Sequence, residues 1–433
     1  PSAAVVGGTT YTPSATSTSS GTVAFTIDSA SSAVCSITSG TVSFQTAGTC
    51  KVLADQTGNT NWNAASQQFQ SFTIGKGAQT IVITSAAPTN AVVDGDTYTV
   101  TATGGNSTSS VISSIASSSA AVCAIASGVV TFLAAGTCVV EVNQAGDDNY
   151  LAATVQTQTI TVGKGSQVVA FTTSAPTGVR VDGDVYVPTA TGGASTSAVS
   201  ISVAPSSSVI CAISNGEVSF NAVGSCVLQL DQAGDANYTA ATQVTQTITV
   251  AKGLQNITKT STDPSGVVGG ATYTPTFTGG ASGSAIVVAI ASASATKCSV
   301  ANGTISFTGA GDCDVTVNQA GTSNYEAAPE VTFTITVGKG SQSIAWTTTA
   351  PTSAVVGGAT YTPTATGGAT GNTVSFRVDV NTASVCAMSL GVVRFVGVGT
   401  CTVLANQNGN NDYLAAAQES QTFTVGKGSQ TIT

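Results

Sequence analysis

The sequence contains no histidine, and only 7% of its residues are charged, against a usual share of about 25%. Histidine is the commonest general base and a common zinc ligand, so its absence counts against both an enzyme and a zinc site. No acidic pair and no serine–lysine pair that could replace it recurs in all five repeats. We therefore expect no catalytic residues and no cofactor.

Positive charge is also scarce, because the chain has three arginines and a net charge of -9 at pH 7. Nucleic acids and acidic membranes bind basic surfaces, so neither is an expected partner. Residues 117–140 carry no charge and are as long as a membrane helix. Alternating apolar residues and glycines favour a hairpin there instead, and an equivalent segment carries Glu217. We predict no membrane insertion in this chain.

Cysteine, by contrast, is plentiful and regularly spaced. The ten cysteines form five pairs, each with a separation of fifteen residues, and successive first cysteines lie 88, 88, 87 and 88 residues apart. A Gly-Lys-Gly motif keeps the same step, with alanine replacing its first glycine in one copy. Such a period defines a tandem repeat. The pairs are Cys35 and Cys50, Cys123 and Cys138, Cys211 and Cys226, Cys298 and Cys313, and Cys386 and Cys401.

Paired cysteines indicate disulfides in an oxidising compartment, so we predict an extracellular or cell-surface protein. Zinc binding is the competing interpretation of cysteine pairs. Each repeat offers only two thiols and no Cys-x-x-Cys spacing, which is too few ligands for a zinc site. The ten cysteines are therefore predicted to form one disulfide in each repeat.

Each cysteine pair lies in a set of three short predicted strands. Val122 and Cys123 begin the first strand, Val130 and Phe132 share one face of the second, and Cys138 opens the third. A meander would place both cysteines at the same end, and in an immunoglobulin-like (Ig-like) sandwich the first and third strands belong to opposite sheets. We predict a bridge that joins the two sheets and contributes about 3 kcal/mol.

Further along each repeat, an aspartate or asparagine and a glutamine precede a glycine loop and an aromatic residue. Tyr150 is an example, and we interpret its ring as a cap on the end of the core, with an exposed glycan-binding patch as the alternative. The Gly-Lys-Gly linker follows, and its lysine is interpreted as a solvated charge. An isopeptide bond from Lys76 to an asparagine is the alternative.

Two repeats carry a pair of carboxylates in a turn where the other three have glycine. These are Asp94 with Asp96 and Asp182 with Asp184. Carboxylates at this spacing could hold calcium. Because three repeats lack them, a solvated turn is the preferred interpretation.

The segment from the first cysteine to the third strand resembles the bacterial Ig-like group 2 domain of invasin and intimin type surface proteins. Those domains carry Val-Ala-x-Val, Gly-x-Val and Ala-Gly-Thr-Ala-x-Ile patterns. Here cysteine stands at both alanine positions, as at Cys123 and Cys138, with Gly128-Val129-Val130 and Ala135-Gly136-Thr137 between them. The resemblance implies a seven-strand sandwich and a stalk or adhesin role. It transfers no catalytic or ligand residue.

The fold class predicted is all-β, a linear array of five Ig-like β-sandwich modules. Pro1 aligns with Pro88 and Pro351, so the first module lacks its opening strand. Either the chain is a window from a longer array, or residues 429–433 complete the first module of another copy. The predicted modules are 1–77, 78–165, 166–253, 254–340 and 341–428, and residues 429–433 begin the first strand of a next module.

The favoured function is structural, a stalk or the body of a bacterial surface fibre or filament. Five modules with linkers of three residues would extend to roughly 200 Å. A surface with little charge does little to prevent association, so we expect copies of the chain to pack side by side or head to tail. The alternative is an adhesin that binds glycan or host protein through module loops, such as Thr103-Gly104-Gly105.

Overall fold

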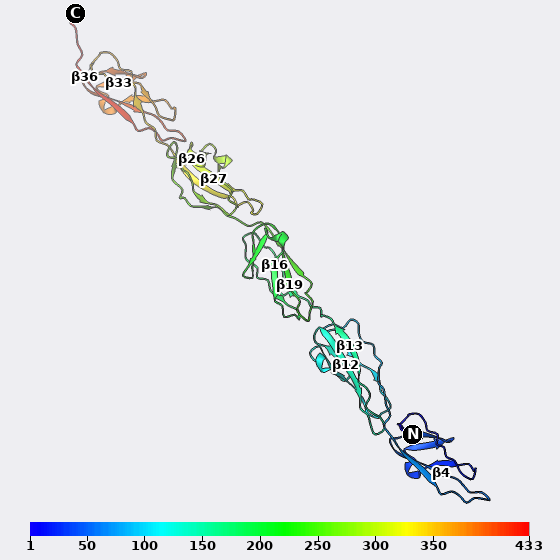
Figure 1. Cartoon of the computed structure of the whole chain (residues 1–433). Coiled ribbons are helices and arrows are strands. Elements are labelled where there is room, and N and C mark those ends of the chain that lie inside the picture. Colours follow the sequence, from blue (N-terminus) through cyan, green and yellow to red (C-terminus); the bar gives the residue numbers. More distant parts are fainter. Residues whose placement is uncertain (433) are drawn as a thin grey trace. The chain divides into compact units, whose positions relative to one another are not determined.

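The computed structural model describes residues 1–432 and confirms the all-β prediction (Figure 1). Its helices are one-turn 3-10 segments of three residues, and the strands are short. The structure contains five disulfide-bearing Ig-like modules, and Figure 1 shows β12 and β13 side by side in the second one. The sequence prediction of residues 429–433 as a further strand concerns a segment whose last residue lies outside the described part.

The chain divides into two compact units, and the division passes through the third repeat. One unit consists of Pro1–Ser174, Pro188–Ser202 and Leu228–Gln246, and the other of Ala175–Val187, Val203–Val227 and Thr247–Thr433. The boundaries between the five modules stay predictions.

The first two repeats lie in the first unit. The first contains β1 (Ala24–Ile27), η1 (Ser29–Ser31), β2 (Cys35–Thr38), β3 (Thr41–Phe44), β4 (Gly48–Asp55) and β5 (Gln68–Ile74). The second contains β6 (Val82–Ile83), β7 (Tyr98–Thr99), β8 (Ala102–Thr103), β9 (Val111–Ile115), η2 (Ser117–Ser119), β10 (Cys123–Ala126), β11 (Val129–Phe132), β12 (Gly136–Gln144) and β13 (Gln156–Val162).

The third repeat is shared between the units, and the last two repeats lie in the second unit. The third contains β14 (Ala170–Phe171), β15 (Ala190–Thr191), β16 (Val199–Val203), η3 (Pro205–Ser207), β17 (Cys211–Ser214), β18 (Glu217–Phe220), β19 (Gly224–Gln232) and β20 (Val244–Val250).

The fourth repeat contains β21 (Thr258–Lys259), β22 (Gly266–Val267), β23 (Phe277–Thr278), β24 (Ile286–Ile290), η4 (Ser292–Ser294), β25 (Cys298–Ala301), β26 (Thr304–Phe307), β27 (Gly311–Gln319) and β28 (Val331–Gly338). The fifth contains β29 (Ala345–Trp346), β30 (Ala354–Val355), β31 (Ala365–Thr366), β32 (Ser375–Val378), η5 (Val380–Thr382), β33 (Cys386–Ser389), β34 (Val392–Phe395), β35 (Gly399–Asn406) and β36 (Glu419–Gly426).

In the second repeat, strand β12 is the centre of one sheet, between β9 and β13. Both neighbours pair with it antiparallel. Alternation along β12 puts Cys138, Val140 and Val142 in the interior, and none of the three exposes any surface. This is the period of two that a strand with one buried face requires.

The other sheet of this repeat is built on the β10–β11 hairpin, with β11 also pairing to β7. The third strand, β12, belongs to the opposite sheet, as predicted for the first and third strands of an Ig-like sandwich. The chain crosses between sheets at Gly136, where φ is +151°. A β-carbon there would lie 3.2 Å from the Val122 side chain, which favours glycine.

The disulfides cross from one sheet to the other. Cys123 on β10 is bonded to Cys138 on β12, with the two α-carbons 5.8 Å apart, and both side chains are buried. The bridge therefore joins the two sheets, as predicted from the strand pattern. The remaining bonds join Cys35 to Cys50, Cys211 to Cys226, Cys298 to Cys313, and Cys386 to Cys401.

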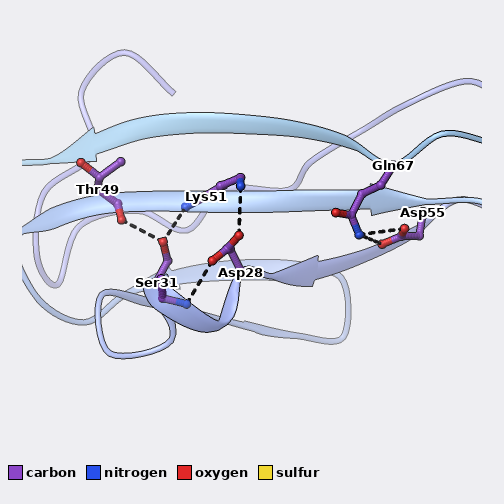
Figure 2. Close-up of polar contacts among 7 residues, drawn as sticks. Asp28, Ser31, Thr49, Lys51, Asp55 and Gln67 are labelled. Atoms are coloured by element: carbon purple, nitrogen blue, oxygen red, sulfur yellow. Dashed lines mark hydrogen bonds and ion pairs between the residues drawn. The ribbon is translucent and has the colours of Figure 1, made fainter.

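A buried hydroxyl four residues before the first cysteine ties the 3-10 turn to the strand of the second cysteine. In the first repeat, Ser31 Oγ donates to Thr49 O at 3.0 Å and accepts from Lys51 N at 3.2 Å, on either side of Cys50 (Figure 2). Asp28 caps the same turn through Ala30 N and forms an ion pair with Lys51 at 3.0 Å. This position was not among the predicted ones, although a serine or threonine recurs there in all five repeats: Ser31, Ser119, Ser207, Ser294 and Thr382.

Replacing Ser119 with alanine should destabilise the second module. Ser119 is 2% exposed, and the change leaves Thr137 O and Val139 N without their partner. Loss of a buried partner costs about 1–3 kcal/mol. We expect faster hydrogen exchange in β12 peptides, measured by mass spectrometry. The exposed neighbour Ser118→Ala is the matched control, and equal exchange in the two variants would contradict this role for Ser119.

Candidate functional site at the module junctions

Successive repeats touch through a loop that we call the head loop, residues 145–151 in the second repeat. Its backbone pairs with the linker: Gly77 N donates to Asn149 O, and Leu151 N donates to Gly77 O, each at 2.9 Å. The Asn149 side chain reaches further, because its Oδ1 accepts from Ala47 N of the first repeat at 2.9 Å. The linker is therefore part of a bonded junction.

The aromatic residue of the head loop covers the core of the preceding repeat. Tyr150 is half-buried against the cluster that contains Cys35, Cys50 and Val6. A β-carbon on Gly77 would lie 2.5 Å from Val6 O and 3.1 Å from the Tyr150 ring, so this linker position requires glycine. The sequence prediction that the ring caps a core agrees with this packing, but the core belongs to the neighbouring repeat.

The same contacts recur at later junctions within each unit. Tyr238 packs on the second core and Tyr413 on the fourth. The residue before the aromatic accepts from a backbone N–H of the preceding repeat each time, namely Asn237 from Ala135, Asn324 from Val223, and Asp412 from Ala310. The recurrence of Asn or Asp directly before the aromatic is the pattern that could have revealed this role.

The linker lysines bind the next head loop. Lys76 Nζ donates to the carbonyl oxygen of Asp147, Lys164 Nζ to that of Asp235, and Lys339 Nζ to that of Asn410. The three lysines are exposed, as expected of solvated charges, but each is also bound to the head loop of the next repeat. Their acceptors are backbone carbonyls, so these contacts do not place an asparagine side chain at the ammonium for an isopeptide bond.

An aspartate organises the head loop itself. Asp235 accepts from the backbone N–H groups of Thr196, Asn237 and Tyr238 at 2.8–3.0 Å. These bonds, the one from Thr196 first, lower the pKa of Asp235 to about 2. Asp147 makes equivalent bonds, and the one from Thr108 is the main cause of its lowered pKa. In the second and third repeats, the loop conformation that presents the tyrosine thus depends on an ionised carboxylate.

Two buried glutamines fill the loop at Thr103-Gly104-Gly105, where the adhesin alternative would place a ligand. Gln144 Oε1 accepts from Gly105 N at 2.7 Å, and Gln79 Oε1 accepts from Ser107 N at 2.8 Å. A β-carbon on Gly105 would lie 2.7 Å from Gln79 Cβ, which accounts for the paired glycines. The loop is thus occupied by the module's own side chains.

The first repeat differs at this place. Ser17 and Thr18 stand where the second repeat has Gly104 and Gly105. The first repeat has two hollows, of about 240 and 330 Å³, that share Ala15, Ala54 and Gln68. The first strand occupies the corresponding place in the second repeat. In the second repeat, Gln79 of the first strand comes close to Gly105. A strand placed in the same register on the first repeat would bring its glutamine against the Thr18 side chain, because Thr18 stands at the position of Gly105.

Among residues 1–432, no three His, Cys, Asp or Glu side chains come together in a group that could hold a metal ion. Asp94 instead accepts a hydrogen bond from the Tyr238 hydroxyl, and Asp182 accepts one from Tyr325. Within the same described residues, no helix has the length and apolar character needed to cross a bilayer.

Comparison with known proteins finds similar solved structures among tandem extracellular arrays. Sidekick-1 immunoglobulin domains 1-5 are 11% identical, over 94% of this chain and 92% of that chain, with a TM-score of 0.26. Drosophila N-cadherin EC1-4 is 10% identical over 75% and 93%, with a TM-score of 0.22. The S-layer protein rSbsC(31-844) is 12% identical over 93% and 65%, with a TM-score of 0.21.

At these identities and scores the likeness carries no functional argument. No family model matches the sequence, and no curated protein does. The resemblance to the invasin and intimin type stays a proposal.

Replacing Tyr150 with alanine should loosen the first junction. Trypsin cleaves after lysine, and Lys76 is exposed in a linker whose backbone is bonded on both sides. Without the ring on the first core, we expect cleavage after Lys76 to become about ten-fold faster, as opening of a site governs its proteolysis. Trp62→Ala is the matched control, because Trp62 has the same loop position and is 55% exposed. An unchanged rate in Y150A would contradict the role of the ring.

Acid should loosen the head loops. The lowered pKa of Asp235 means that its stabilising contribution is present above its ordinary value of 3.8 and is lost as pH falls toward about 2. We expect the thermal unfolding midpoint, followed by circular dichroism, to fall in this window. The midpoint of the D147N/D235N variant should fall less over the same pH range. Asparagine can replace the aspartate, since Asn410 makes the equivalent loop bonds without a charge. D96N/D148N removes the same number of charges and is the charge-matched control, and a fall in D147N/D235N as steep as in the native chain would refute the proposed dependence.

Proposed function

We propose that this chain is a structural extracellular protein, a stalk or the body of a bacterial surface fibre. The observation that carries the proposal is the bonded junction. A head loop that binds the linker and covers the preceding core restricts bending between neighbours, and it recurs with the same residue types. Repeat arrays whose units contact only their neighbours form elongated structures.

The proposed location is the cell surface or the extracellular space. Five disulfides support it, because a reducing cytosol would leave these cysteines as thiols. Bacterial origin and the module boundaries remain part of the proposal.

The proposed partner is another copy of the chain. Charged residues are 7% of the sequence, so little electrostatic repulsion opposes side-by-side packing. Direct head-to-tail donation of residues 429–433 is less favoured, because Thr18 stands where the strand-bearing module has glycine. The adhesin alternative also has less support, since the glycine loop at 103–105 holds the module's own Gln144 and the ring of Tyr150 packs on the preceding core.

Small-angle scattering of the full chain tests the rod. A rod of about 200 Å has a radius of gyration of about 58 Å, whereas a compact protein of this length has one of about 22 Å. We expect the larger value at low protein concentration. A value close to the compact one would refute the stalk, and a mass that stays monomeric at high concentration would refute lateral packing.

A further inference from the structure

Two of the five repeats have aspartate at a turn position with positive φ where the other three have glycine. The turn before the Tyr-bearing strand has a left-handed backbone, with φ of +69° at Gly7, +67° at Gly269 and +75° at Gly357. At the same position φ is +55° at Asp94 and +54° at Asp182. A residue with a β-carbon is disfavoured in this region, so aspartate needs a compensating interaction.

The compensating interaction reaches the next repeat. The Tyr238 hydroxyl donates to Asp94 Oδ2, while its ring packs on the core that contains Cys123 and Cys138. The bond to Asp94 is the main cause of a raised pKa for Tyr238, with Asp235 adding a smaller electrostatic effect. Lys164 of the linker is bonded to the same head loop. The tyrosine is thus held at both its ring and its hydroxyl.

The third repeat repeats this arrangement with Asp182 and Tyr325. The Tyr325 hydroxyl donates to Asp182 Oδ2, and this bond is the main cause of its raised pKa. A β-carbon on Gly253 of the linker would lie 2.9 Å from the Tyr325 ring. Both aspartates therefore meet a tyrosine from the head loop that follows.

The junction between the fourth and fifth repeats lacks this carboxylate. A β-carbon built on Gly269 would lie 3.8 Å from the Tyr413 hydroxyl. A side chain at this position would therefore point toward the tyrosine, but glycine offers it no acceptor. The first junction likewise has Gly7 at this position.

We propose that Asp94 and Asp182 form a binding site for the hydroxyl of the next module's tyrosine and lock two of the four junctions. The junctions after the second and third repeats then open less readily than those after the first and fourth. The inference deepens the proposed stalk function and rests on it, since it assigns the array stiffer central joints. Calcium, the other ligand suggested by this carboxylate spacing, is not needed for the lock.

Removal of the lock is tested in the full chain by the trypsin cleavage rate after Lys164. Both D94N and D94G should raise this rate about three-fold, as expected for a solvent-exposed charged contact. D96N changes the net charge equally and is the control, with cleavage after Lys76 as the internal reference. Unchanged cleavage after Lys164 in both D94N and D94G would overturn the proposal.

D94G separates the lock from a general role in folding. Glycine relieves the left-handed strain, so hydrogen exchange within the second module should become slower while its junction opens faster. If Asp94 only stabilised the fold of its own module, D94G would make both hydrogen exchange within that module and cleavage after Lys164 faster. That result would overturn the proposal. Added calcium should leave the rate after Lys164 unchanged, whereas slower cleavage with calcium would assign these carboxylates to a metal.

The lock should also be transferable. G269D places a carboxylate opposite Tyr413 and should slow cleavage after Lys339 about three-fold relative to the native chain. G357D introduces the same strain without a following tyrosine in this chain and should not slow it. A rate in G269D equal to that in G357D would overturn the lock. These rates are independent of the scattering test, so a failed lock leaves the stalk proposal intact, and a compact chain would refute the stalk alone.

Discussion

The contact on which the junctions depend is an aromatic ring seated over the disulfide-containing core of the preceding module. The ring buries apolar surface that one module cannot cover by itself, and burial of this kind is the main favourable term in protein association. In the first junction, Tyr150 joins the cluster around Cys35 and Cys50. Tyr238 and Tyr413 pack likewise on the cores of the second and fourth repeats, which couples the stability of these modules to that of the module that follows.

Polar contacts set the geometry that the apolar contact alone would leave free. At the first junction the head loop is held by Asp147, the linker by Lys76 and two backbone bonds, and the neighbouring module by the side chain of Asn149. Because few charges are available, most of these bonds use backbone groups, as at Asn149 and Gly77. Hydrogen bonds are directional, so they fix how the ring sits on the core.

Repetition made the module itself predictable from sequence. Five copies of the cysteine spacing and of the apolar alternation predicted an all-β module with a bridge between sheets, and the bond between Cys123 and Cys138 agrees. The role of Ser119, whose hydroxyl ties the 3-10 turn to β12, could have been found by the same comparison, since a hydroxyl recurs four residues before each first cysteine. The position of the crossing at Gly136 could not, because a strand pattern does not say at which residue the chain passes to the other sheet.

The sequence by itself determined the strand periodicity, the pairing of the cysteines and the positions that differ between repeats. The tertiary structure alone decided that the tyrosine covers a neighbouring core and that Lys76 and Asn149 bind across the junction. It also gave Asp94 a partner, Tyr238, that lies 144 residues further along the chain. The physical reason is that periodicity reports which face of a strand is buried, whereas contacts between modules depend on how two separate loops meet in space.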